Sequence, residues 1–391
     1  MIPAALRRLD PRPIAANPGA VQNDIPHGLT DGVALTVWGS DGLRTAVASA
    51  APLLADAKPD VVQLHAGPTG LAKHLEAQAD EVRRFAPDAG LWVGVAWDGW
   101  VSNAAKPGAD VPRLVERVYV PAAKAAFRAG ASLFVVNSEA AGKLHPRAAR
   151  TLTVLAIDRI REECPGMLLA VTSYDHPDYH DEETGNGRID ADDEGYPWSA
   201  GHGGPVARAV GGLLLPKSGR VELALPQRYA APAKDPVTKR QPRAGLGALD
   251  KRVASSHSSW ARAVALGWID PALPVRDYVQ GHHVDPRDTV KHLVVNDLVA
   301  VWAAPTRLDA EGAAAIRVAL RVRRGLATAA DLRGPDAALY TAALQAIVGA
   351  KHDGSWGPLT SAAAARWILD RGYSGGGDAA SVLAILGRIS A

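Results

Sequence analysis

The stretch Ala131-Ser-Leu-Phe-Val-Val-Asn-Ser-Glu-Ala140 is a run of apolar residues that ends abruptly in polar ones. A nearly continuous apolar run of this length is typical of a parallel strand that is covered on both faces. Its polar end, Asn137, Ser138 and Glu139, would then lie at the carboxyl edge of a sheet. We therefore expect a buried strand that brings the Glu139 carboxylate to the carboxyl edge of this sheet.

Similar apolar runs recur along the chain, and stretches rich in Ala, Arg and Leu separate them. The eight runs are 32–38, 61–66, 91–97, 132–137, 167–173, 221–226, 275–281 and 298–302. Helices are expected at about 43–56, 69–86, 111–129, 146–163, 203–214, 247–267, 286–296 and 308–325. This order predicts an α/β protein with a (β/α)8 TIM-type barrel over 32–326. A doubly wound sheet is the alternative, but Trp38-Gly-Ser-Asp-Gly after the first run is not its Gly-rich phosphate loop.

The two ends of the chain differ from this pattern. Residues 1–31 are rich in Pro, Asn and Gly, which predicts an irregular arm. Residues 335–391 predict a small unit of three helices, at 337–350, 360–371 and 378–389. The turn before the second of these helices reads His352-Asp-Gly-Ser-Trp-Gly-Pro-Leu-Thr360.

This C-terminal unit resembles the small three-helix peptidoglycan-binding domain of bacterial and phage cell-wall enzymes. The residues that carry the resemblance are Leu344, Gln345, Asp353, Gly354, Trp356, Gly357, Pro358, Thr360, Ala364 and Trp367. The resemblance implies that bacterial cell-wall polysaccharide is the partner, with Asp353 and Trp356 as wall-binding residues. It also implies that phage or particle components are possible further partners.

Composition limits the other classes of function. Hydrophobic residues make up 47% of the chain and charged residues 21%, which is enough for a large core. The net charge is only +2, and no dense Lys/Arg stripe with interleaved aromatics predicts nucleic-acid binding. The single cysteine, Cys164, excludes an intrachain disulfide.

The sequence also shows neither a membrane span of ~20 apolar residues nor a secretory signal. We therefore expect synthesis in the cytoplasm and access to the wall through lysis or delivery in a particle.

Polar and aromatic residues close the predicted strands, and in a barrel these residues would face one opening. The predicted substrate-binding residues are Trp38, His65, Trp97, Asn137, Tyr174, Tyr229, Gln280, His282 and Trp302. The chain has ten Trp and eight Tyr but three Phe. Trp and Tyr combine a flat apolar face with a polar tip, which suits sugar rings. In the alternative interpretation, Trp38, Trp97 and Trp302 only plug the barrel.

Glycosidic cleavage needs two carboxyl groups that flank the bond. Glu139 is the predicted general acid, because desolvation beside a hydrophobic strand raises the pKa of a carboxyl group. Asp98 and Asp175 are its predicted partners, and the alternative role for Glu139 is a helix cap or an ion pair.

The stretch Val-Val-Asn-Ser-Glu139 resembles the fourth-strand end of barrel glycosidases, including muramidases. Many retaining members also carry a Glu at the end of strand seven, where this chain has Gln280 and His282. The resemblance therefore implies an inverting or substrate-assisted scheme, or a barrel that has lost its chemistry.

Histidines near the strand ends raise the alternative of a metal site. His65, His176, His282 and His283 fall near strand ends, with Asp98 as a further candidate ligand. Metal-dependent barrel hydrolases usually begin with His-x-His on the first strand, where this chain has Thr-Val-Trp38, so we predict no catalytic metal and no cofactor. The acidic segment 182–193 aligns in part with a calcium-binding loop, and either a calcium site or a solvated loop fits its sequence.

Two functions follow from these observations. The first is a cell-wall glycoside hydrolase with Glu139 as general acid and Asp175 or Asp98 as partner. The alternative is a non-catalytic structural or wall-binding component of a phage tail or similar assembly, built on a degenerate glycosidase barrel.

Overall fold

The computed structural model shows a closed barrel of eight parallel strands in chain order, with the last strand paired to the first. It describes residues 32–39, 42–96, 111–137, 146–174, 220–230, 241–265, 269–296, 298–302 and 308–390. The strands are β1 (Gly32–Trp38), β2 (Val61–Ala66), β3 (Gly90–Ala96), β4 (Leu133–Asn137), β5 (Leu168–Tyr174), β6 (Leu223–Arg228), β7 (Asp277–Gln280) and β8 (Leu298–Trp302). The predicted barrel is confirmed, and the doubly wound alternative is excluded.

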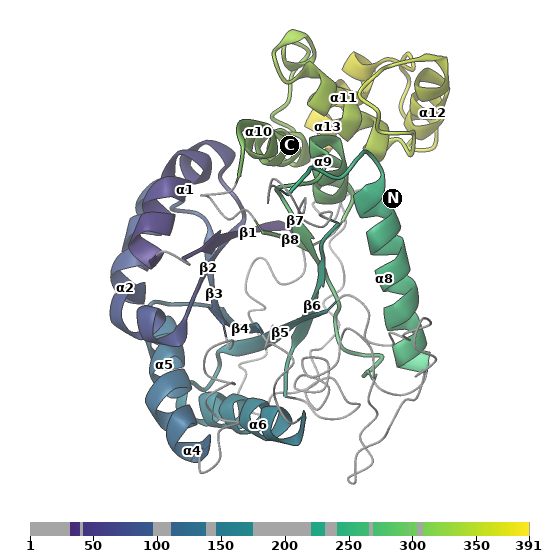
Figure 1. The fold of residues 1–391 in the computed structure, drawn as a ribbon. Coiled ribbons are helices and arrows are strands. Elements are labelled where there is room, and N and C mark those ends of the chain that lie inside the picture. The colour runs from purple at the N-terminus through teal and green to yellow at the C-terminus, as the bar shows by residue number, and fades with distance from the viewer. Residues whose placement is uncertain are drawn as a thin grey trace.

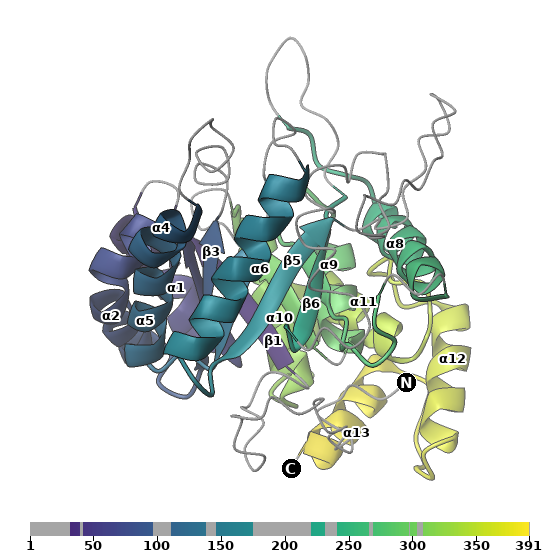
Figure 2. The same cartoon turned by 90° about the horizontal axis from the view of Figure 1, so that it is seen from below.

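Helices surround the barrel (Figure 1) and form a layer around the strands (Figure 2). They are α1 (Leu43–Ala57), α2 (Pro68–Phe85), α4 (Val111–Leu114), a π-helical turn at Val115–Tyr119, α5 (Val120–Arg128), α6 (Pro146–Glu163), α8 (Ala248–Ala265), α9 (Pro286–Val295) and α10 (Ala310–Arg323). The local sequence explains where two of these helices begin. Asp285 and Asp309 cap α9 and α10 by accepting hydrogen bonds from the Arg287 and Gly312 amides.

Strand β6 lies two residues later than its apolar run predicts. Before the strand begins, the Glu222 carboxylate accepts a hydrogen bond from the Leu169 amide at 2.8 Å and one from Arg161 at 2.9 Å. The strand then extends as far as Arg228, whose side chain is buried against α8 by a hydrogen bond to Ser256 at 2.8 Å. Polar contacts at both ends, rather than hydrophobicity alone, therefore set the bounds of this strand.

Two expected segments lie outside the described residues. They are the N-terminal arm at 1–31 and the helix at 203–214. None of the helices in the described part of the chain combines the length and apolar character needed to cross a membrane.

Side chains inside the barrel change character along its axis. An apolar cluster of inward-facing residues includes Ala34, Trp92, Leu133, Leu223 and Tyr278. Further along the strands, the buried inward residues are polar: Thr36, Gln63, His65, Thr172, Gln227 and Gln280. Working sites of such barrels lie at the carboxyl ends of the strands, and the polar half of this interior lies toward that end.

The three C-terminal helices are α11 (Ala337–Ile347), α12 (Pro358–Leu369) and α13 (Ala379–Ser390), after a 3-10 turn at Asp331–Arg333. Helix α12 begins two residues earlier than predicted, because Pro358 suits the first turn of a helix. Helix α11 packs on α9 and α10, and one hydrophobic core continues from the barrel helices into this unit. The Arg321 guanidinium also donates to the Tyr340 hydroxyl at 2.9 Å.

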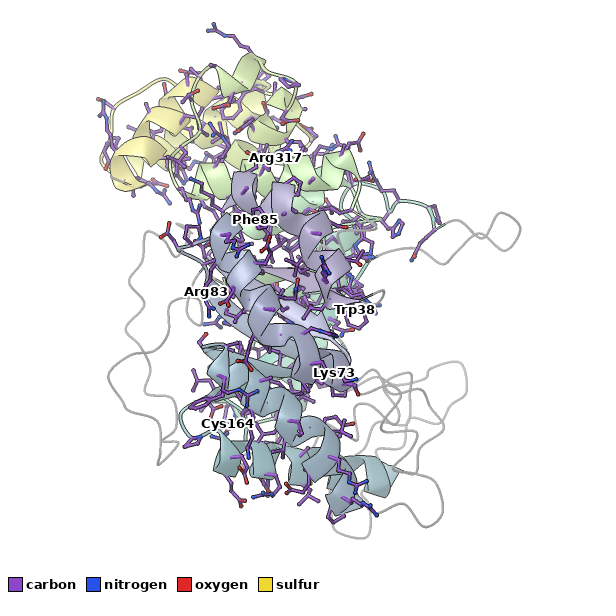
Figure 3. All side chains as sticks on the ribbon, turned by 90° about the vertical axis from the view of Figure 1, so that its left-hand side faces the viewer. Trp38, Lys73, Arg83, Phe85, Cys164 and Arg317 are labelled. Atoms are coloured by element: carbon purple, nitrogen blue, oxygen red, sulfur yellow. The ribbon has the colours of Figure 1, made fainter. Side chains whose placement is uncertain are left out.

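Arg317, labelled in Figure 3, lies on α10 and forms ion pairs with two other parts of the chain. It pairs with Asp56 of α1 at 3.3 Å and with Asp336, which precedes α11, at 3.8 Å. The C-terminal unit is therefore held on the barrel by both apolar and charged contacts.

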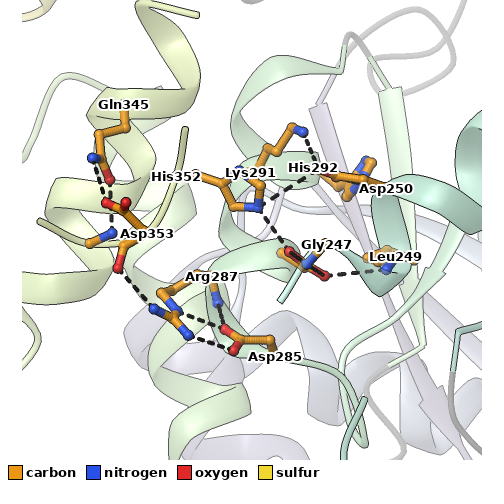
Figure 4. Close-up of polar contacts among 12 residues, drawn as sticks. Gly247, Leu249, Asp250, Asp285, Arg287, Lys291, His292, Gln345, His352 and Asp353 are labelled. Atoms are coloured by element: carbon orange, nitrogen blue, oxygen red, sulfur yellow. Dashed lines mark hydrogen bonds and ion pairs between the residues drawn. The ribbon is translucent and has the colours of Figure 1, made fainter. Parts of the chain in front are cut away.

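A buried polar junction joins α8, α9 and the C-terminal turn (Figure 4). The Asp288 side chain is fully buried and accepts hydrogen bonds from the Gly247 amide at 2.9 Å and the Leu249 amide at 3.2 Å. His352 of the C-terminal turn lies with its Nε2 atom 2.8 Å from the same carboxylate. Beside it, Arg287 donates to the Asp353 carbonyl at 2.8 Å.

Candidate functional site

Aromatic rings gather at the carboxyl end of the barrel, where β1, β2 and β8 end. The ring centroids of Trp38 and His65 are 4.3 Å apart, and those of Trp38 and Trp302 are 4.7 Å apart. Tyr229 and Tyr278 extend the group, each about 6 Å from Trp302 between ring centroids (6.2 Å and 6.0 Å). We call these five residues the mouth cluster. The structure thus brings together four of the predicted substrate-binding residues: Trp38, His65, Tyr229 and Trp302.

A hydrogen-bonded row of side chains links two members of this cluster, Tyr278 and His65, across the barrel interior. The Tyr278 hydroxyl donates to Thr36 Oγ1 at 2.9 Å, and Thr36 donates to Gln63 Oε1 at 3.4 Å. The Gln63 amide nitrogen lies 3.4 Å from His65 Nδ1. Tyr278 and Thr36 are 242 positions apart in the sequence, so only closure of the barrel between β8 and β1 brings them together.

Gly94 on β3 makes room for the Gln63–His65 pair. A Cβ atom at this position would lie 2.3 Å from His65 Nδ1 and 2.6 Å from Gln63 Nε2. Both distances are shorter than any real contact of a Cβ atom, so the two side chains would have to move. The glycine is therefore required by the packing of its neighbours.

His65 is fully buried, and burial lowers its pKa to about 3. The imidazole is therefore uncharged at neutral pH. Its Nε2 atom has no hydrogen-bond partner among the described residues, and the same holds for Oε1 of buried Gln280. A buried polar atom without a partner is uncommon in folded proteins and requires an explanation.

We predict that His65 makes the protein lose stability in acid. The unfolded chain binds a proton at this histidine below about pH 6.5, whereas the folded chain does not until about pH 3. Between these values the free energy of unfolding falls as the pH falls, by roughly 2 kcal/mol from pH 6.5 to pH 4.5. His65→Gln, which cannot titrate, should flatten this part of the curve in urea unfolding. Parallel curves for the two proteins would contradict the prediction.

Two further predicted residues lie beside the cluster. Gln280, which ends β7, pairs in register with Trp302 on β8. His282 follows β7 and has its Nδ1 atom 3.4 Å from the Trp302 carbonyl, while its ring lies 4.9 Å from that of His283. These contacts place both residues at the same end of the barrel as the mouth cluster.

The remaining predicted residues of the barrel site are only partly described. Glu139, Asp98, Asp175, Trp97 and His176 lie outside the described residues, as does the segment 182–193. For Asn137 and Tyr174, which end β4 and β5, only the backbone is described. The pair of catalytic carboxylates and the calcium loop therefore stay predictions.

The predicted wall-binding residues make contacts within their own turn. Asp353 accepts hydrogen bonds from the Gln345 side chain at 3.0 Å and from the Ser355 amide at 3.1 Å, and these bonds hold the pKa of its carboxyl group below the usual range. The Trp356 indole donates to Ser361 and to the Gly377 carbonyl, both at 3.1 Å. The motif thus stabilises the turn, and wall binding by Asp353 and Trp356 stays a prediction.

Among the described residues, one group has the composition of a metal site: Asp250, Asp288 and His352. Protein donors already surround both carboxylates. Asp288 accepts from two backbone amides, and Asp250 contacts Lys291 and His292. We therefore interpret the group as part of the polar junction rather than as a metal centre.

Sequence reasoning missed Thr36, Gln63 and Tyr278. A signal for the first two was present, since each interrupts an apolar run at an inward-facing position. Tyr278 gave no such signal, because an aromatic residue inside a strand is ordinary core.

Comparison with known proteins leaves the activity open. The sequence matches no protein-family model and no curated protein. Among solved structures, a tri-modular GH5 (subfamily 4) endo-β-1,4-glucanase from Bacillus licheniformis aligns with 75% of this chain at 12% identity and a TM-score of 0.45. The match covers 60% of the glucanase, so this chain spans well under the full length of that protein.

Other solved structures resemble the chain at similar levels. The cellulose synthase subunit Z from Clostridioides difficile has 12% identity and a TM-score of 0.42, over 74% of this chain and 99% of that one. A dihydrodipicolinate synthase from Agrobacterium tumefaciens has 12% identity and a TM-score of 0.38, over 93% and 98%. The names describe different activities, and resemblance at this level does not choose among them.

Proposed function

We propose that this protein is a cell-wall glycoside hydrolase that binds its glycan at the mouth cluster. The observation that carries the proposal is the close grouping of the Trp38 and Trp302 rings with the polar, uncharged imidazole of His65. The flat faces of the two indole rings suit the C–H surface of a sugar ring. Apolar walls with a few convergent polar groups are the usual composition of a small-ligand site.

The described strand ends support the placement of the carboxylates. In the strand register, Asn137 at the end of β4 pairs with Ala96 on β3 and with Thr172 on β5. Asp98 and Glu139 follow the ends of β3 and β4 by two residues, and Asp175 follows β5 directly. The three strands that precede these acidic residues thus end beside one another, which supports the proposal that the carboxylates act together.

In the proposed reaction, Glu139 protonates the leaving oxygen of the glycosidic bond, and Asp175 or Asp98 acts as base or electrostatic stabiliser. A separation of about 6.5–9.5 Å between the two carboxyl groups would leave room for a water molecule and give inversion of the sugar. Gln280 stands at the end of β7, so the proposal does not use a nucleophile from that strand.

Peptidoglycan is the proposed substrate, and the C-terminal unit supports this choice. The sequence of its turn resembles that of a peptidoglycan-binding domain, and Gln345 bonds to Asp353, Ser355 and Thr360 to hold that turn. Because the unit packs on α9 and α10, it would present the turn at a fixed position relative to the barrel.

We expect Glu139→Gln to lower the rate of peptidoglycan hydrolysis at least about a hundredfold, because the amide cannot donate the proton that the leaving group needs. A turbidity assay on purified peptidoglycan measures this rate. Glu76→Gln is the control, since Glu76 forms an exposed ion pair with Arg128, and it should keep the wild-type rate.

Other outcomes of this assay would change the proposal. Equal rates for wild type and Glu139→Gln would remove Glu139 from the mechanism. Sedimentation with peptidoglycan, but no lysis by the wild type, would instead support a non-catalytic wall-binding or structural component of a phage-type assembly.

A further inference from the structure

The hydrogen bonds that link Tyr278, Thr36, Gln63 and His65 all run in one direction, from donor to acceptor toward His65. The Tyr278 hydroxyl donates to Thr36, so the Thr36 hydrogen is available to Gln63 Oε1. With its oxygen engaged, Gln63 presents its amide nitrogen to His65 Nδ1 at 3.4 Å. An amide nitrogen only donates, so Nδ1 is the acceptor and the imidazole proton lies on Nε2.

Packing keeps the imidazole in this orientation. The ring of Trp38 lies 4.3 Å from that of His65, and a Cβ atom at Gly94 would lie 2.3 Å from His65 Nδ1, so only a glycine at this position leaves room for the ring. The Trp302 ring lies 5.7 Å away, edge-on to the imidazole. The imidazole is thus packed against two indole rings, and its Nε2–H donor has no partner among the described residues.

We propose that His65 is a fixed Nε2–H donor that binds an uncharged oxygen of the glycan, and that Tyr278, Thr36 and Gln63 are positioning residues that set its tautomer. This inference rests on the proposed function and names the chemistry of the same site. The ligand atom is a hydroxyl oxygen or an acylamino carbonyl oxygen.

The charge of the site explains the preference for an uncharged oxygen. Burial keeps His65 neutral at physiological pH, so the site offers no full positive charge to a carboxylate or a phosphate. Gln280 Oε1, also buried and without a described partner, offers an acceptor. A sugar supplies both kinds of partner, because its hydroxyl groups accept as well as donate.

The first test is the tautomer of His65. Two-bond 1H–15N correlation spectra of the full chain, labelled at histidine, distinguish the two neutral tautomers, and His65→Gln identifies the signals of His65. We expect the Nε2–H form in the wild type. In Thr36→Val, which keeps the shape but removes the hydroxyl link, we expect a mixture of tautomers.

The second test is binding of soluble, peptide-free glycan strands from peptidoglycan, measured by calorimetry. His65→Phe removes the donor and should weaken binding about tenfold, the effect of one lost hydrogen bond. His65→Gln keeps an N–H group and should retain most of the affinity. A purely structural role would not produce this rescue.

Different results of these two tests contradict different parts of the proposal. An Nδ1–H tautomer in the wild type, or an unchanged tautomer in Thr36→Val, overturns the positioning chain. Equal affinity in wild type and His65→Phe overturns the ligand role and leaves a buried water as the partner of Nε2, while glycan binding itself survives. A wild type that binds no glycan overturns the proposed function together with this inference.

Discussion

Asp288→Ala is expected to lower the free energy of unfolding by roughly 3–5 kcal/mol. Asp288 is fully buried at the polar junction and accepts hydrogen bonds from the Gly247 and Leu249 amides. Alanine would leave both amides buried without an acceptor, and it would separate His352 from its partner. Each buried group that loses its partner costs about 1–3 kcal/mol.

The neighbouring carboxylate does not compensate for this loss. His352 Nε2 lies 3.9 Å from Asp250, beyond hydrogen-bonding distance. Burial alone would raise the pKa of the Asp250 carboxyl group, but hydrogen bonds from His292 and Lys291 outweigh burial and hold that pKa well below its usual range. Asp250 is therefore already engaged on α9, so it cannot replace Asp288.

Urea unfolding followed by tryptophan fluorescence measures the effect of Asp288→Ala. Asp309→Ala is the matched control, because it removes a half-exposed helix cap and should cost only about 1 kcal/mol. We also expect the barrel and the C-terminal helices to unfold in one transition, since they share a core. Equal losses for the two variants would show that the junction contributes no more than a surface cap.

Arg228→Met should also lower the free energy of unfolding by roughly 3–5 kcal/mol, because it breaks a buried ion pair. Arg228 on β6 pairs with Asp277 on β7, and both side chains are almost completely covered by the rest of the chain. Methionine fills much of the volume of arginine but leaves the Asp277 charge buried. Two other side chains stay in contact with Asp277, His257 Nε2 at 3.2 Å and the Asn296 amide at 3.3 Å. Both contacts lie at the long end of hydrogen-bonding distances, so we expect them to offset only part of the loss.

A double variant separates the ion pair from the packing. In Arg228→Met with Asp277→Leu, no buried charge remains, and we expect most of the lost stability to return. Arg84→Met, which breaks the exposed pair with Glu81, is the surface control and should change stability by less than about 1 kcal/mol. If the double variant were at least as unstable as Arg228→Met alone, packing rather than charge would explain the effect.

Much of the fold follows from local patterns in the sequence. Apolar runs such as 61–66 and 132–137 predict buried parallel strands, and amphipathic stretches predict the helices between them. The differences lie at the ends of elements, as at the start of α12 and at both ends of β6. Strand β6 was predicted two residues early, because the contacts of Glu222 and Arg228 that set its ends involve residues far away in the chain.

The candidate site was predictable only in part. Trp38, His65, Tyr229 and Trp302 follow from the rule that strand ends face one opening, and the structure brings their rings together. That rule does not give the Tyr278–Thr36–Gln63 chain, the requirement for glycine at 94, or the Asp288–His352 contact.

The sequence by itself determined the order and type of the elements, because hydrophobic periodicity is a property of neighbouring residues. The tertiary structure alone decided which polar groups are neutral, paired or left without a partner. Those properties depend on strand register, on barrel closure between β8 and β1, and on the docking of α11 against α9. Such contacts join residues up to 242 positions apart, and no local pattern records them.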